Sequence, residues 1–161
     1  MPRKTSMTIT ATLLLLSVAG CGASGPFFQP AAINENVAAI YIYRPGMNYV
    51  GSGMILIVRC DGEKVGTLKP NGYLATIVSP GRHVISCATE TKTQVPFDAE
   101  AGESYYIEMG IDMGLFMGRP RLIMVPPETG QRAILGTRYS GRTPPPHEVA
   151  IEELHTVQPT P

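Results

Sequence analysis

Three methionines at four-residue intervals, Met109, Met113 and Met117, form the most regular pattern of side chains with chemical potential in this sequence. Thioether sulfurs are ligands for Cu(I), so this spacing raises the question of a copper site. A glycine follows each methionine, and three glycines in nine residues disfavour the helix that would align the sulfurs. We therefore expect Met109 to lie in a strand core. Residues 110–120 should form an apolar loop that packs locally or contacts a partner or a membrane. No metal site and no cofactor is predicted.

The histidines and the known catalytic motifs give no sign of an enzyme. His83 follows a Pro-Gly turn and is expected to help fix that corner, whereas His147 and His155 lie near the C-terminus. The sequence has no G-x-S-x-G, Walker or H-E-x-x-H motif. Nothing marks a pair of carboxylates for glycoside chemistry. We predict no catalytic residue.

Cys21 ends a segment with the features of a lipoprotein signal peptide. Residues 1–20 begin with basic side chains and continue into an apolar run too short to span a bilayer as a permanent helix. Residues 18–21, Val18-Ala19-Gly20-Cys21, resemble the bacterial lipobox. In that motif the cysteine thiol receives a diacylglyceryl group by thioether formation. We predict cleavage before Cys21, lipid attachment at Cys21 and anchoring in a membrane, since two or three acyl chains hold a protein firmly. The alternative is an ordinary secretory signal.

The residue after Cys21 bears on location. Gly22 stands there, whereas in Gram-negative lipoproteins an aspartate at this place commonly retains the protein in the inner membrane. The expected location is therefore the bacterial cell envelope. If the source is Gram-negative, it is the outer membrane, facing the periplasm.

Cys60 and Cys87 then remain as an even pair in an oxidising compartment. Both lie in expected strands, and each alternates in step with apolar neighbours, so both side chains can face one interior. A bridge that closes a loop of about 28 residues would stabilise the fold by roughly 3–4 kcal/mol. We expect a Cys60–Cys87 disulfide. The alternative is two buried free thiols.

The composition limits the class of protein. The chain has 161 residues, which suits one domain. Its 13 basic and 13 acidic residues balance, so nothing supports binding to nucleic acid, which depends on clustered Lys and Arg. With 43% hydrophobic residues, the chain is too apolar to be disordered.

Short apolar segments separated by turn signals predict an all-β fold. We expect a small β-sandwich of about seven or eight short antiparallel strands. In 104–112, apolar and mostly polar residues alternate, whereas both faces of 37–44 are apolar, as in a central or doubly covered strand. The strands are expected near residues 37–44, 54–60, 64–69, 73–79, 83–89, 93–98, 104–112 and 121–125.

Turn residues and composition divide the chain. Asp61-Gly62 and Asn71-Gly72 are hairpin signals, because these residue types tolerate positive φ. At most one short helix is expected, with Pro127 near its first turn and its end near Leu135, and Gly130 is unfavourable within it. The expected organisation is a signal peptide at 1–20, a lipidated tether at 21–36, a β-sandwich domain at 37–136 and a flexible proline-rich tail at 137–161.

Two short segments of the sequence resemble those of a known family. Residues 58–68 (VRCDGEKVGTL) and 78–83 (VSPGRH) are similar to those of small bacterial lipoproteins grouped as domain of unknown function family 2846. Residues 40–44 and 122–126 also resemble that family, and residues 58–68 together with 78–83 resemble the PEGA-type surface module. The resemblance implies a small β-sandwich on a lipid anchor and no established catalytic activity.

The predicted function is that of a lipid-anchored envelope β-domain with a binding or structural role. Its membrane contact is the anchor at Cys21, and an envelope protein is the expected partner class. The contact region would be a sheet face with Arg44, Arg59 and Tyr106, or the 110–120 loop. The alternatives are a lipoprotein inhibitor of an envelope or wall-degrading enzyme and, less favoured, an envelope hydrolase without a recognisable motif.

Overall fold

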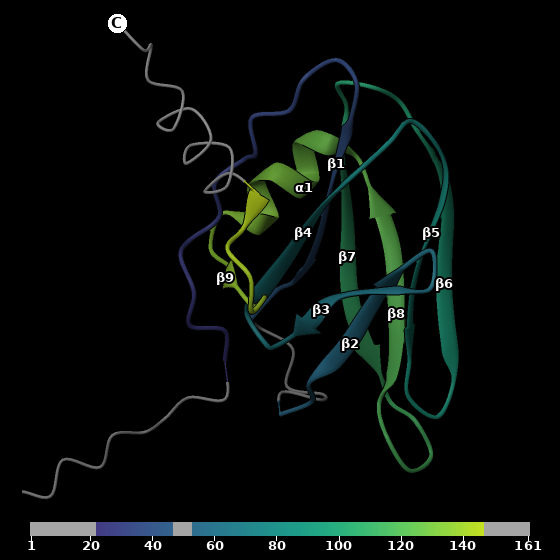
Figure 1. Ribbon diagram of the computed structural model, residues 1–161. Helices are drawn as coiled ribbons and strands as arrows, with labels where there is room; N and C mark the ends of the chain where they lie inside the picture. The colour runs from purple at the N-terminus through teal and green to yellow at the C-terminus, as the bar shows by residue number, and fades with distance from the viewer. Residues whose placement is uncertain (1–21, 47–52, 147–161) are drawn as a thin grey trace, which may run out of the picture.

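The computed structural model describes residues 22–46 and 53–146. These residues form an all-β sandwich of two sheets with one short helix, α1 (Figure 1). All eight expected strand segments are present, and β9 is an addition that the sequence pattern did not reveal. The elements are β1 Ala38–Arg44, β2 Leu56–Cys60, β3 Glu63–Leu68, β4 Gly72–Val78, β5 Gly81–Ala88, β6 Lys92–Ala99, β7 Ser104–Asp112, β8 Arg119–Val125, α1 Pro127–Ile134 and β9 Arg138–Tyr139.

The strand order corrects one expectation. One sheet has the order β8-β7-β1-β4-β9, and the other has the order β3-β2-β5-β6. The second sheet is antiparallel throughout. In the first sheet, however, β1 pairs in parallel with β7, and β4 pairs in parallel with β9. After β4 the chain forms the β5–β6 hairpin in the other sheet and returns beside β1 in the same direction, so the sandwich is not entirely antiparallel.

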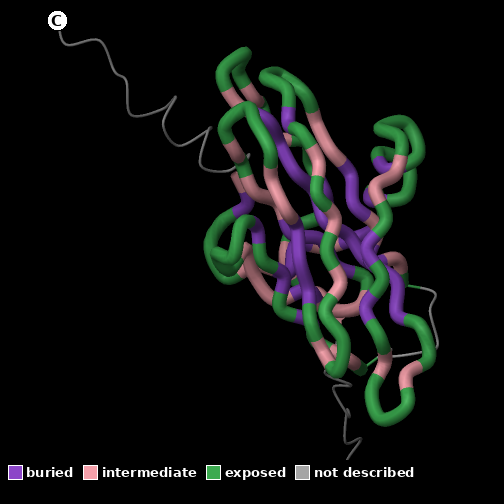
Figure 2. Tube along the Cα trace, turned by 90° about the vertical axis from the view of Figure 1, so that its right-hand side faces the viewer, coloured by how far each residue is buried: buried purple, intermediate pink, exposed green. Residues whose placement is uncertain are grey.

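The main core lies between the two sheets. Alternate residues of β1 and β7 face it, among them Ile40, Ile42, Ile107 and Met109, all fully buried. Figure 2 shows buried stretches along the middle of the strands and exposed turns at both ends. Burial of each large apolar side chain contributes roughly 1.5–3 kcal/mol. The expected core position of Met109 is confirmed.

A second, aromatic core covers the outer face of the five-stranded sheet. Tyr41 of β1 stacks on Tyr106 of β7, with ring centroids 5.2 Å apart, and meets the edge of Phe28 at 5.1 Å. Tyr73 and Tyr139 continue this cluster. Strand β1 is therefore buried on both faces, as the sequence pattern predicted.

Helix α1 closes over this aromatic core. Pro127 occupies its first turn, where the missing N–H costs no helical hydrogen bond. Gly130 lies directly on Tyr106, and a Cβ there would collide with the tyrosine side chain. The glycine that disfavoured a helix in the sequence is thus what lets this helix approach the sheet closely.

The segments that flank the expected domain are part of the fold. Phe28 is buried, and the amide of Gly25 donates to the carbonyl of Tyr139 at 3.1 Å. The guanidinium of Arg138 lies 3.9 Å from the ring centroid of Phe27. Residues 25–28 of the expected tether therefore pack on the sheet, and the described fold continues past the expected boundary at 136 into β9. Residues 147–161 lie outside the described residues.

Candidate functional site

The connection between β7 and β8, residues 113–118, exposes a set of large apolar side chains and is called here the 113–118 loop. Met113 is 81% exposed, Leu115 76%, Phe116 88% and Met117 51%. Figure 1 shows the loop projecting from the lower end of the sandwich. The sequence predicted an apolar loop here, and contiguous exposed apolar side chains of this kind mark contact surfaces.

Glu90, in the turn between β5 and β6, links that turn to the 113–118 loop by hydrogen bonds. Its carboxylate accepts hydrogen bonds from the amides of Leu115 at 3.1 Å and Phe116 at 3.3 Å, and from Nε of Arg119 at 3.2 Å. The neighbouring hydroxyl of Thr89 donates to the carbonyl of Gly118 at 2.9 Å. Desolvation raises the pKa of Glu90, but these hydrogen bonds outweigh it and the pKa lies below its ordinary value.

The methionine and glycine spacing is explained by this geometry. The segment is a tight loop without helix, and a Cβ on Gly114 would collide with the carbonyl of Met117 and the carboxylate of Glu90. Met109 points into the core whereas Met113 and Met117 point outward, so the three sulfurs do not converge. Glu90 was missed from sequence, because no local pattern links it to amides 25 residues away.

A second cluster joins Cys60, Asp61 and His83, whose polar atoms all lie within 4.8 Å of one another. Asp61 occupies the β2–β3 turn with φ 51°, and Gly62 follows with φ 89°, which confirms the expected Asp-Gly hairpin. Nδ1 of His83 lies 2.6 Å from Oδ2 of Asp61, and Nε2 lies 2.8 Å from the carbonyl of Ser79. His83 therefore fixes this corner, as its position after the turn predicted.

The electrostatics of this cluster suit a structural role. The hydrogen bond to Asp61 raises the pKa of His83, and the same bond lowers the pKa of Asp61. Burial, with the charge of Asp61, raises the pKa of the Cys60 thiol to about 11. Both imidazole nitrogens are engaged and the thiol is protonated near neutral pH. The arrangement offers neither an available base nor an activated nucleophile.

The expected disulfide is not present, and the structure has Cys60 and Cys87 as buried free thiols. Both face the core, as strand alternation predicted. Cys60 pairs with Ile85, however, and Cys87 pairs with Val58, so the cysteines are diagonal across the strands. Diagonal neighbours lie about 7–8 Å apart, with their Cβ atoms somewhat closer, and this exceeds the roughly 4 Å between Cβ atoms that a bridge requires.

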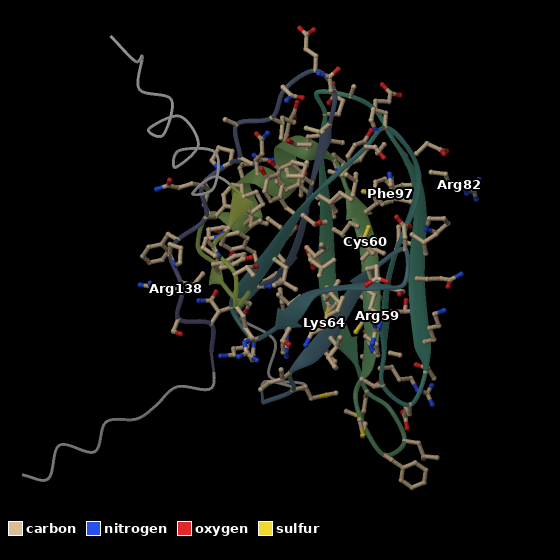
Figure 3. The ribbon with its side chains drawn as sticks, viewed as in Figure 1. Arg59, Cys60, Lys64, Arg82, Phe97 and Arg138 are labelled. Atoms are coloured by element: carbon tan, nitrogen blue, oxygen red, sulfur yellow. The ribbon has the colours of Figure 1, made fainter. Side chains whose placement is uncertain are left out.

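The expected contact face with Arg44, Arg59 and Tyr106 does not exist. Arg44 and Tyr106 are each only 1% exposed. Arg44 donates to the carbonyl of Met54 at 2.7 Å, and Tyr106 lies beneath α1. Only Arg59 is exposed, on the other sheet, where it donates to the carbonyl of Gly62 at 2.9 Å. Figure 3 shows Arg59 and Cys60 on the β2 side of the molecule, far from Arg138 of β9.

The predicted lipid-attachment residue, Cys21, lies just outside the described residues. Its neighbour Gly22 begins the described chain, and the amide of Ala23 donates to the carbonyl of Pro70 at 3.1 Å. Among the described residues, no helix has the length and apolar character needed to cross a bilayer.

Comparison with known proteins places the chain in a family. A family model described as "Protein of unknown function (DUF2846)" matches residues 34–119, more than half of the chain. This span includes β1 to β7 and the whole 113–118 loop. No curated protein matches the chain, and no solved structure matches it. With its two-sheet sandwich and this match, the chain belongs to the DUF2846 family of proteins of unknown function.

Proposed function

We propose that this protein is a lipid-anchored β-domain of the cell envelope that acts by contact, with the 113–118 loop as its contact element. Cys21 carries the lipid, and the outer membrane is its location if the source is Gram-negative. The motif Val18-Ala19-Gly20-Cys21 and the short apolar run before it support the anchor.

The contact role is supported by two features of the 113–118 loop: its large apolar side chains are exposed, and its backbone is hydrogen-bonded to Glu90. Four large apolar side chains face solvent while Glu90 pins the backbone beneath them. Burial of each such side chain would contribute roughly 1.5–3 kcal/mol of free energy, which is not gained while it is exposed to water. Binding to a partner would bury these side chains and release that free energy. Because the backbone is already hydrogen-bonded, binding would cost little conformational entropy.

The same observations bear on the alternatives. We propose no catalytic role, because the one cluster of cysteine, aspartate and histidine among the described residues has its imidazole nitrogens engaged and its thiol protonated. An inhibitor that inserts into an enzyme cleft would present a single exposed anchor on its loop. The 113–118 loop presents four apolar side chains, which is a broad apolar surface, so the inhibitor role is not favoured.

The anchor is tested with Cys21→Ser in the native host, with Cys87→Ala as the matched control. Wild type and the control should incorporate labelled fatty acid and lose residues 1–20, whereas Cys21→Ser should remain as an unlabelled precursor. Acylation of Cys21→Ser, with membrane association that survives an alkaline wash, would contradict the proposed anchor.

The contact role is tested with a photo-crosslinking side chain at position 116, in cells that make the full chain. Crosslinked products should form from position 116 and not from position 101, which lies in an exposed turn at the other end of β7. Equal labelling from both positions would show that the 113–118 loop is not the contact element.

A further inference from the structure

We infer that the 113–118 loop enters the membrane leaflet that holds the lipidated Cys21, so that the domain is docked on the bilayer at two points. This inference rests on the proposed anchor and names the partner of the contact element: phospholipid acyl chains. A protein partner for the same loop is the competing outcome of the test below.

The first argument is the position of the loop relative to the anchor. The described chain starts at Gly22, directly after Cys21, and Figure 1 shows this start and the 113–118 loop both toward the lower end of the sandwich. A bilayer that holds acyl chains next to Gly22 would therefore face the end of the sandwich from which the loop projects.

The second argument is that the loop has the shape of an inserted element. Its apolar side chains point into solvent, while the amides of Leu115 and Phe116 donate to Glu90. Thr89 fixes the other end of the loop through the carbonyl of Gly118. The two or three acyl chains proposed at Cys21 supply the attachment itself, so insertion of the loop would fix the orientation of the domain on the bilayer.

The third argument concerns charge, and it decides what kind of membrane contact this is. Arg119 is paired with Glu90 at 3.2 Å, and Arg121 is paired with Asp112 at 3.3 Å. The two arginines at the base of the loop are thus neutralised by their own partners. The contact should depend on apolar insertion, with little dependence on anionic lipid or on salt.

The test uses the full-length mature lipoprotein and a single tryptophan. The chain has no tryptophan, so Phe116→Trp creates the sole reporter, at a position that is 88% exposed and makes no core contact. Ala101→Trp is the matched control. It places the reporter in the exposed turn before β7, and the nine residues of β7 separate the two sites by roughly 30 Å.

Each variant is reconstituted in phosphatidylcholine vesicles, with or without bromine atoms on the acyl chains near the headgroups. The tryptophan of Phe116→Trp should shift its emission to shorter wavelength and lose most of its intensity in brominated vesicles, whereas the tryptophan of Ala101→Trp should do neither. Raising the salt concentration or adding phosphatidylglycerol should leave the quenching in Phe116→Trp unchanged. Circular dichroism checks that both variants are folded.

Three outcomes are separated by measuring the mass of the same samples. An acylated Phe116→Trp protein whose emission remains unquenched overturns the docking inference and leaves the proposed anchor intact. If the reporter at position 116 is unquenched in pure lipid but protected in native envelope membranes, the loop contacts a protein, and the lipid assignment is wrong. A protein without acyl mass overturns the proposed anchor and, with it, the orientation inferred here.

Discussion

At the scale of single residues, Asp61 and His83 form an ion pair whose two pKa values are both shifted. The two groups shift in opposite directions, since the histidine pKa is raised and the aspartate pKa is lowered. The second carboxylate oxygen of Asp61 also accepts a hydrogen bond from the amide of Val84 at 2.8 Å. The pair therefore ties the β2–β3 turn to the start of β5.

Asp61→Asn tests the pH dependence of this tie, because asparagine keeps the turn geometry and can still accept the Val84 amide. The contribution of His83 is complete below its ordinary pKa of 6.5 and is lost as pH rises through its raised folded value. The contribution of Asp61 is present above 3.8 and is lost as pH falls through its lowered folded value. The stability difference between wild type and variant should therefore be largest between about pH 4 and 6.5.

The expected size of that difference is about 0.5–1 kcal/mol, because the pair is partly exposed to solvent. Urea unfolding at several pH values measures it, with Asp98→Asn, at an exposed site, as the control. NMR titration should also show that the His83 pKa falls in Asp61→Asn. An equal stability difference at pH 5 and pH 9 would contradict the assigned charges.

The cysteine thiols give a second residue-scale prediction. In protein isolated without reductant, Cys60 and Cys87 should both be alkylated in denaturant and only slowly in the native state, because both are buried and the Cys60 pKa is raised to about 11. Peptide mapping by mass spectrometry reads each site separately. A linked pair of peptides containing Cys60 and Cys87 would show that the bridge forms after all.

At the scale of elements, the approach of α1 to the sheet depends on one glycine. Gly130→Ala improves intrinsic helix propensity by about 1 kcal/mol but places a methyl group against Tyr106. Crowding in a packed core costs typically about 1–3 kcal/mol, so we expect a net loss of stability. Thr129→Ala, at the exposed neighbouring position, is the matched control and should be neutral or slightly stabilising. Equal melting midpoints for the two variants would mean that α1 is not packed as described.

At the scale of the whole molecule, the domain extends beyond both ends of the family match at residues 34–119. Phe28 from the N-terminal segment and Tyr139 from β9 complete the aromatic core beside Tyr41 and Tyr73. These outer segments pack on the second face of the five-stranded sheet, which would otherwise be exposed to solvent. Their removal should therefore affect folding.

Truncation after Gly136 tests this whole-molecule assignment. It removes β9 with Tyr139, and loss of a buried aromatic side chain costs about 3–5 kcal/mol. The melting midpoint should fall by roughly 10 °C for a domain of this size. Truncation after Pro146 is the control and should leave the midpoint nearly unchanged, since the sequence predicts that the remaining proline-rich tail is dispensable. A stable chain ending at Gly136 would restore the boundary expected from composition.

Local physics explains what the sequence by itself determined. Alternation of apolar residues defines strands because side chains alternate across a sheet, and Asp61-Gly62 defines a turn because both residues adopt positive φ. These signals are read over a few residues. They led to all eight strand segments, the all-β sandwich, the core position of Met109 and the apolar loop beyond it.

Only the tertiary structure decided the features that depend on which strands meet. Register made Cys60 and Cys87 diagonal, and α1 covered Tyr106, which strand alternation had assigned to the mostly polar face. Glu90 reached the 113–118 loop from another hairpin and hydrogen-bonded the amides of Leu115 and Phe116. Such contacts join residues far apart in sequence, and their free energy depends on the packing of the whole sandwich, so no local pattern encodes them.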